Sequence, residues 1–177
     1  TTYREGVVGR LHKGLQGLVS SRKVDYGEGA GRLEGDRTVV VGDRRLVGKH
    51  VVLATGSYAR TLPGLELGGP VVTSDGALAL DAVPARVVVL GGGVIGVEFA
   101  SVMRSFGAEV TIVEALPRLV AAEDPAVSTA LERAFRKRGI AFSLGVRFAS
   151  ATQDDAGVHV TLEDGKVLDD ELLLVAV

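Results

Sequence analysis

Continuous apolar runs mark the second half of the chain. Val87–Leu90, Val110–Val113 and Leu172–Val177 are dominated by Val, Leu and Ile, which is typical of parallel strands buried on both faces. Residues 93–106 lie between the first two runs and repeat apolar residues at helical spacing. The order strand, helix, strand predicts a βαβ unit. We therefore expect an α/β, Rossmann-like domain of three layers.

Shorter elements complete this half of the chain. Asp124 as N-cap and Pro125 at the first helical position predict a helix that runs to about Arg138. Either Ser74 or Asp75 is expected to cap a short helix. Three segments before the last run indicate a β-meander. The remaining predicted strands are Val71–Val72, Ile140–Leu144, Arg147–Thr152, Val158–Leu162 and Val167–Leu168.

The first half begins with an amphipathic pattern that predicts a helix over residues 3–20. Glycines indicate a turn region at Gly27–Gly31, and a stretch rich in Gly and Pro, Leu62–Pro70, is the best linker candidate. The first half is therefore expected to end at Ala54–Ser57, just before this stretch. Short strands are predicted at Val24–Tyr26, Val39–Val41, Arg45–Val47 and His50–Leu53.

Composition narrows the classes of function. The net charge of −2 gives no electrostatic reason to expect a nucleic acid or an anionic membrane as partner. No apolar run approaches the roughly 20 residues of a membrane span. The absence of cysteine from the 177 residues excludes a thiolate nucleophile or thiolate metal site in this chain, and it fits the cytoplasm. His12, His50 and His159 show no triad or metal spacing, and we assign no catalytic or metal-binding residue.

A glycine-rich turn follows the first continuous apolar run. In the pattern Gly91-x-Gly93-x-x-Gly96, the first glycine permits a tight turn and the second lets the backbone approach a pyrophosphate. The third lets the helix pack closely on the strand, and the helix N-terminus offers free N–H groups to phosphates. A glycine turn without a nucleotide is the alternative. The strand before the turn and the helix after it favour a dinucleotide.

Glu114 ends the next predicted strand, 18 residues after Gly96. The acid that binds the adenosine ribose is expected about 20 residues beyond the turn. A carboxylate there accepts hydrogen bonds from the ribose hydroxyls and repels the 2′-phosphate of NADP, so NAD is favoured. Arg118 lies nearby, either as a solvated loop residue or as a phosphate contact.

Two further residues have open interpretations. Glu98 lies one turn into the predicted helix, among mostly apolar neighbours. It is either an exposed first-turn acid or a group that needs a cationic partner or a ligand amide. Phe148 follows the third predicted strand, where it either packs in the core or forms an apolar wall beside adenine.

Three stretches together resemble the pyridine nucleotide–disulfide oxidoreductases, and most of all their dihydrolipoamide dehydrogenase branch. They are VVLATGSYARTLPGLE (Val51–Glu66), VPARVVVLGGGVIGVEFASVMRSFGAEVTIVEALPRLV (Val83–Val120) and the final DELLLVAV. The family inserts an NAD domain into an FAD domain. The resemblance implies that residues 1–60 are part of an FAD-binding domain and residues 61–177 the NAD-binding domain.

The resemblance also assigns residues to cofactors. It implies that Val94 gates the nicotinamide face, that Glu98 lies near the nicotinamide carboxamide, and that Phe148 contacts adenine. The implied FAD contacts are Gly31, beside Ala30, and the segment Thr55, Gly56 and Ser57. The implied NAD contacts are Gly91, Gly92, Gly93, Val94, Ile95, Gly96, Val97, Glu98, Glu114 and Phe148.

The resemblance implies a reaction for a longer protein. There, NAD⁺ oxidises a flavin that a dithiol has reduced through an enzyme disulfide, and the partners are lipoyl domains of 2-oxoacid dehydrogenase complexes and a second subunit of a homodimer. The family's first glycine turn, its CxxxxC pair and its His–Glu pair do not occur here. We therefore expect a piece of a longer chain that does not turn over alone. The alternatives are a transhydrogenase, a mercuric or glutathione-type reductase, or a non-catalytic redox-sensing module.

Overall fold

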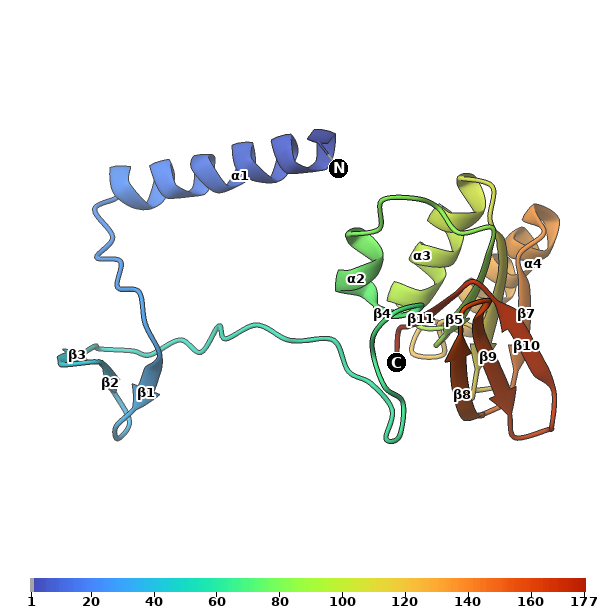
Figure 1. Ribbon diagram of the computed structural model, residues 1–177. Helices are drawn as coiled ribbons and strands as arrows, with labels where there is room; N and C mark the ends of the chain where they lie inside the picture. The colour runs from blue at the N-terminus through green and yellow to red at the C-terminus, as the bar shows by residue number, and fades with distance from the viewer. Residues whose placement is uncertain (1) are drawn as a thin grey trace. The chain divides into compact units, whose positions relative to one another are not determined.

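Two compact units make up the chain. The computed structural model describes residues 2–177, and its units are Thr1–Ser57 and Tyr58–Val177 (Figure 1). The sequence places the division at residue 60, in the same exposed stretch of chain.

The second unit is built on a parallel sheet of five strands in the order β4-β11-β5-β6-β7. From β5 the chain proceeds to β6 and β7 on one side, whereas β11 and β4 lie on the other side. The strand order therefore reverses between β5 and β11, and in open α/β sheets ligands bind at the carboxyl ends of the strands beside such a reversal. The strands are β4 (Val71–Thr73), β5 (Arg86–Leu90), β6 (Glu109–Glu114), β7 (Ala141–Leu144) and β11 (Leu172–Val175).

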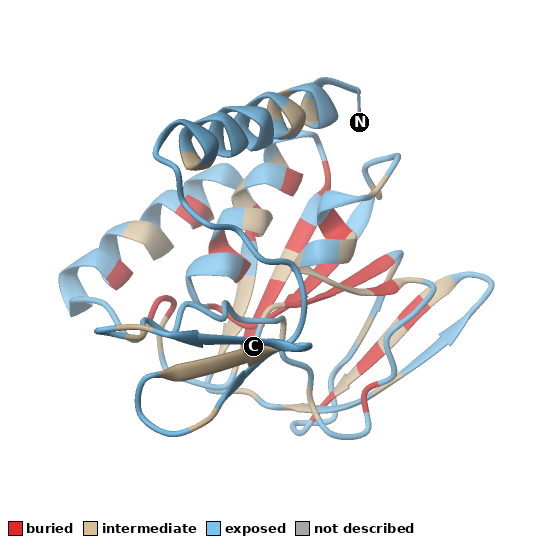
Figure 2. Cartoon of the chain, turned by 90° about the vertical axis from the view of Figure 1, so that its left-hand side faces the viewer, coloured by how far each residue is buried: buried red, intermediate tan, exposed pale blue. Residues whose placement is uncertain are grey.

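Both faces of this sheet are covered, which explains the continuous apolar runs. In β5, Val87 and Val89 pack on the side of the helices, and Val88 and Leu90 pack on the side of an antiparallel meander. Figure 2 shows buried residues concentrated along these strands. The expected three layers and Rossmann-like α/β class are confirmed. The outer layers are formed by α3 (Val94–Ser105) and α4 (Pro125–Arg138), and by β8 (Phe148–Asp154), β9 (Gly157–Leu162) and β10 (Val167–Asp170).

Local signals set the ends of the helices in this unit. The Asp124 carboxylate accepts a hydrogen bond from the Ala126 N–H at 2.7 Å, so the predicted N-cap of α4 is confirmed. Gly139 ends α4 in the left-handed conformation (φ 73°). The prediction for α2 (Ser74–Leu78) was wrong by one residue. Its N-cap is Thr73, the last residue of β4, because the strand runs directly into the helix.

The first unit contains one helix and a small antiparallel sheet. Two predicted strands, Val24–Tyr26 and His50–Leu53, are wrong, since neither segment forms a strand and most of their residues are exposed. Their β-branched residues satisfy a strand pattern, but no neighbouring strand pairs with them in the described chain. Gly31, predicted in a turn, instead begins a strand. The elements are α1 (Thr2–Ser21), β1 (Gly31–Leu33), β2 (Thr38–Val41) and β3 (Arg44–Val47), in the sheet order β1-β2-β3.

Helix α1 buries none of its residues. Its apolar stripe, which includes Leu11, Leu15 and Leu18, is more than half exposed. An amphipathic helix gains most of its stability when such a stripe packs against other elements. The sequence of α1 is therefore typical of a helix that packs against other elements, but α1 itself buries none of its residues.

A histidine lies on the outer face of the meander. Val158 and Val160 of β9 face the core, whereas His159 between them faces outward, as the alternation predicts. Its Nδ1 lies 2.7 Å from an Asp169 carboxylate oxygen, and its Nε2 lies 3.1 Å from an Asp154 carboxylate oxygen. The hydrogen bond with Asp169, followed by that with Asp154, raises the pKa of His159. The doubly protonated ring donates to both carboxylates and bridges β10 to the end of β8.

This bridge predicts a stability difference that depends on pH. Because folding raises the pKa of His159, its contribution is fully present below the unfolded pKa and is lost as pH rises through the folded pKa. The variant His159→Gln should therefore unfold at a lower temperature than the parent protein at pH 5.5 and at the same temperature at pH 9. Thermal unfolding across this range measures the difference, with the exposed His12→Gln as control. A difference that grows toward alkaline pH would contradict the bridge.

Candidate functional site

A tight glycine turn joins β5 to α3. Gly91 has φ +111°, a conformation that L side chains rarely adopt, and a Cβ there would collide with the Ala176 carbonyl at the end of β11. A Cβ on Gly96 would collide with the Gly91 carbonyl. Because neither position carries a side chain, α3 can begin immediately after the turn and pack closely against the end of β5.

Gly93 is different because nothing lies within 4 Å of the place where its Cβ would be. It is the N-cap of α3 and supplies no side-chain cap, so the first amides of the helix have no side-chain acceptor from it. Space in front of Gly93 and unoccupied N–H groups behind it are what a pyrophosphate needs at such a turn. The tight turn at Gly91 and the close packing at Gly96 agree with their spacing, whereas the pyrophosphate contact at Gly93 stays a prediction.

Glu114 ends β6 beside this turn. One of its carboxylate oxygens accepts a hydrogen bond from the Gly92 N–H at 2.6 Å, and the other accepts from the Leu116 N–H at 2.7 Å. Two backbone donors therefore hold the carboxylate in one orientation. Each oxygen keeps a further lone pair, because a carboxylate can accept about four hydrogen bonds.

The loop after β6 folds back over the glycine turn. The Val120 N–H donates to the Gly92 carbonyl at 2.7 Å, and the Leu119 side chain is fully buried. Val120 has φ +44°, a strained conformation for a β-branched residue. Arg118 is half-buried: its Nη2 donates to the Ala121 carbonyl at 2.7 Å, whereas its buried Nε has no partner among the described residues. Arg118 is therefore not a freely solvated loop arginine.

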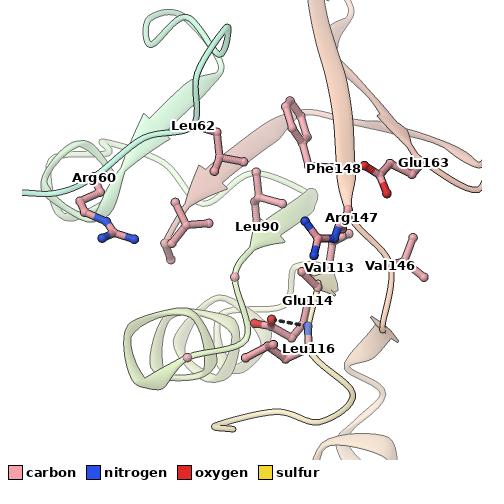
Figure 3. Close-up of a pocket in the computed structure, with 15 residues that line it drawn as sticks. Arg60, Leu62, Leu90, Val113, Glu114, Leu116, Val146, Arg147, Phe148 and Glu163 are labelled. Atoms are coloured by element: carbon pink, nitrogen blue, oxygen red, sulfur yellow. Dashed lines mark hydrogen bonds between the residues drawn. The ribbon is translucent and has the colours of Figure 1, made fainter. Parts of the chain in front are cut away.

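A cleft of about 520 Å³ opens at the carboxyl ends of β5, β6 and β11. Its floor contains Gly91, Gly93 and Glu114, and Phe148 lies on its wall (Figure 3). This is the reversal of strand order where a ligand site is expected. The other lining residues are Arg60, Leu62, Leu90, Val113, Ala115, Leu116, Val146, Arg147, Glu163, Ala176 and Val177.

The structure thus brings together only part of the predicted NAD set. Gly92, Gly96 and Val97 are buried behind the cleft and support its floor. Glu98 is exposed on α3 and does not line the cleft. Val94 and Ile95, in the same helix, are about half exposed and do not line it either. The apolar neighbours of Glu98 are therefore largely open to solvent.

The predicted FAD residues lie in the first unit. Gly31 is exposed in β1, and Thr55, Gly56 and Ser57 are exposed in a segment without regular structure. Among residues 2–57, which the structure describes, no contact gathers them into a site, so their FAD role stays a prediction.

Sequence reasoning missed several residues of the cleft. Leu62 comes from the segment interpreted as a linker, and Arg60 comes from the end of the segment assigned to the FAD domain. Leu116, Arg147 and Glu163 come from loops. One signal was available for Arg147. It directly precedes Phe148 and follows a predicted parallel strand, whose carboxyl end must lie beside the turn.

No helix among residues 2–177 is long and apolar enough to cross a membrane. Within the same described residues, no group of three or more His, Cys, Asp or Glu side chains could hold a metal ion.

Comparison with known proteins identifies the family. Residues 2–177 match the family described as pyridine nucleotide-disulphide oxidoreductase. The chain belongs to this family. The dihydrolipoyl dehydrogenase of Cupriavidus necator is 38% identical over 183 residues, which cover 98% of this chain and 39% of that protein. Dihydrolipoyl dehydrogenase 3 of Pseudomonas putida is 40% identical over 165 residues, covering 90% of this chain and 35% of that protein.

Two solved structures share this fold. LpdA from Mycobacterium tuberculosis superposes with a TM-score of 0.85 at 26% identity, covering 98% of this chain and 40% of that one. The HOCl-induced flavoprotein disulfide reductase RclA from Escherichia coli also gives 0.85, at 27% identity, covering 99% and 41%. The chain thus spans less than half the length of these family members.

The glycine geometry predicts two separable effects. Gly96→Ala should destabilise the protein by about 1–3 kcal/mol, because the new methyl group meets the Gly91 backbone. Gly93→Ala meets no atom and should cost less than about 1 kcal/mol, yet it should weaken NADH binding by filling the approach to the turn. Chemical denaturation and calorimetric titration measure the two effects. Equal stability loss in both variants would contradict this division of roles.

Proposed function

We propose that this chain is the NAD-binding region, with an adjoining part of the FAD domain, of a flavoprotein disulfide oxidoreductase. The observation that carries the proposal is the pairing of the open Gly93 turn with the anchored Glu114 carboxylate on the floor of one cleft. The sequence relatives named dihydrolipoyl dehydrogenase support the same cofactor.

The residues present fit an NAD molecule. The pyrophosphate would meet the first amides of α3 in front of Gly93, where neither a side chain nor a cap occupies the space. The adenosine ribose would meet Glu114, whose two oxygens each keep an acceptor position. When bound, NAD⁺ supplies a hydride acceptor. The chain itself binds and orients it.

Glu114 favours NAD over NADP. Its carboxylate is fixed by the Gly92 and Leu116 amides, so it cannot swing away from a 2′-phosphate without losing both hydrogen bonds. A phosphate placed there would face a like charge at short range, which is an effective way to reject a competing ligand.

The nicotinamide end is assigned by resemblance. Val94 and Glu98 lie on the exposed side of the first turns of α3, beyond the pyrophosphate position. This location is compatible with a gating role for Val94 and with a contact from Glu98 to the carboxamide.

We further propose that the whole protein oxidises dihydrolipoamide with NAD⁺, through FAD and a redox disulfide, as a homodimer that serves lipoyl domains. The 38% and 40% identical relatives favour this reaction. The fold alone does not choose it, because RclA and a ferredoxin reductase from Rhodopseudomonas palustris share the fold. The disulfide must come from outside these 177 residues, since they contain no cysteine.

Calorimetry should find NADH bound about tenfold or more tightly than NADPH, as expected from hydrogen bonds to a charged group. Glu114→Gln should weaken NADH binding by about tenfold and reduce this preference, because the ribose loses a carboxylate and the 2′-phosphate loses a repelling charge. Glu109→Gln, an exposed residue at the other end of β6, is the matched control. Equal affinities of the parent protein for both nucleotides would contradict the assigned role of Glu114.

The chain by itself should not oxidise dihydrolipoamide. A mixture of the protein with FAD, NAD⁺ and dihydrolipoamide should produce NADH no faster than the same mixture without protein, because the chain has no thiol pair to accept electrons from the dithiol. Absorbance at the NADH band measures the rate. Turnover that rises in proportion to the protein concentration would overturn this prediction.

A further inference from the structure

Arg147 is a cationic residue on the edge of the cleft that no part of the proposed function uses. It follows β7 and directly precedes Phe148, and its guanidinium is exposed and points into the cleft (Figure 3). No hydrogen bond or ion pair involves this guanidinium among residues 2–177. A long cationic side chain that lines a cleft without a protein partner is available for a ligand.

The backbone that carries Arg147 is fixed. Its carbonyl accepts a hydrogen bond from the Glu163 N–H at 2.9 Å. Just before it, the Gly145 N–H donates to the Leu116 carbonyl at 2.9 Å, and the Val146 N–H donates to the Glu114 carbonyl at 3.1 Å. The loop after β7 is therefore tied to the loop after β6, and both form one wall of the cleft.

The strand order shows which part of a dinucleotide would reach this wall. The glycine turn ends β5, Glu114 ends the adjacent β6, and Arg147 follows β7, the next strand. A nucleotide with its pyrophosphate over β5 and its ribose over β6 must carry its base toward the end of β7. The base then lies against the apolar side chains of Val146 and Phe148.

An adenine in that position keeps one face open to solvent. A planar guanidinium stacks on an aromatic face more favourably than an ammonium group does, and it tolerates water on its other side. The alternative ligand for Arg147 is a 2′-phosphate. Glu114 disfavours this alternative, because its fixed carboxylate lines the same cleft at the ribose position.

We propose that the Arg147 guanidinium stacks on the adenine of the bound nucleotide and so increases affinity for its adenosine half. This inference rests on the proposed NAD-binding function. It assigns a ligand contact to a residue that the glycine motif and the ribose acid do not include.

Titration with ADP-ribose and with nicotinamide mononucleotide tests the contact. Arg147→Ala should weaken ADP-ribose binding by roughly 3- to 10-fold, the size of a partly exposed stacking interaction. Binding of nicotinamide mononucleotide, which lacks adenine, should be unchanged. Arg147→Lys keeps the charge without the planar group and should recover only part of the affinity. Arg133→Ala, which removes an exposed arginine of α4 outside the cleft, should match the parent protein.

Each contrary outcome has a distinct meaning. Failure of the parent protein to bind ADP-ribose would overturn the proposed NAD-binding function itself. If the parent protein binds ADP-ribose and Arg147→Ala binds it equally well, only the stacking contact is overturned. Full recovery by Arg147→Lys would also overturn stacking, since charge alone would then suffice. A loss confined to 2′,5′-ADP, with 5′-ADP unaffected, would assign Arg147 to the 2′-phosphate. Equal thermal unfolding of the ligand-free variants shows that the fold is intact.

Discussion

The Glu114 carboxylate holds the floor of the cleft together. It joins the end of β6 to the glycine turn after β5 through the Gly92 amide, and to its own following loop through the Leu116 amide. A partly buried carboxylate needs such donors, because a polar group that leaves water without a hydrogen-bond partner loses free energy. The same two bonds fix the carboxylate where a ribose would lie. If NAD binds as proposed, the position of the glycine turn and the recognition of the ribose both depend on the Glu114 side chain.

Much of the second unit could be predicted from the sequence because its physical requirements are local. Continuous apolar strands, the Asp124 cap and the spacing of the three glycines each have one dominant interpretation. The residues of the cleft wall could not be predicted in this way, because they come together through contacts between distant parts of the chain. Arg60 and Arg147 reach it only because the sheet brings loops more than 80 residues apart to one edge, and a linear pattern does not report that proximity.

The first unit shows where strand and helix patterns are insufficient. His50–Leu53 has the composition of a strand but lacks a strand to pair with, and the apolar stripe of α1 stays exposed. A hydrophobic pattern shows which residues a segment could bury. Whether the segment forms a strand or a packed helix depends on a neighbouring strand or apolar surface to contact. The chain spans less than half the length of its dihydrolipoyl dehydrogenase relatives.

We propose that one cleft holds the pyrophosphate at the glycine turn and the ribose at Glu114. A crystal structure of the protein with NADH bound would show both contacts. We expect pyrophosphate oxygens on the first amides of α3 in front of Gly93, and both adenosine-ribose hydroxyls on the Glu114 carboxylate. A nucleotide bound elsewhere on the chain, or one in this cleft with its ribose turned away from Glu114, would contradict it.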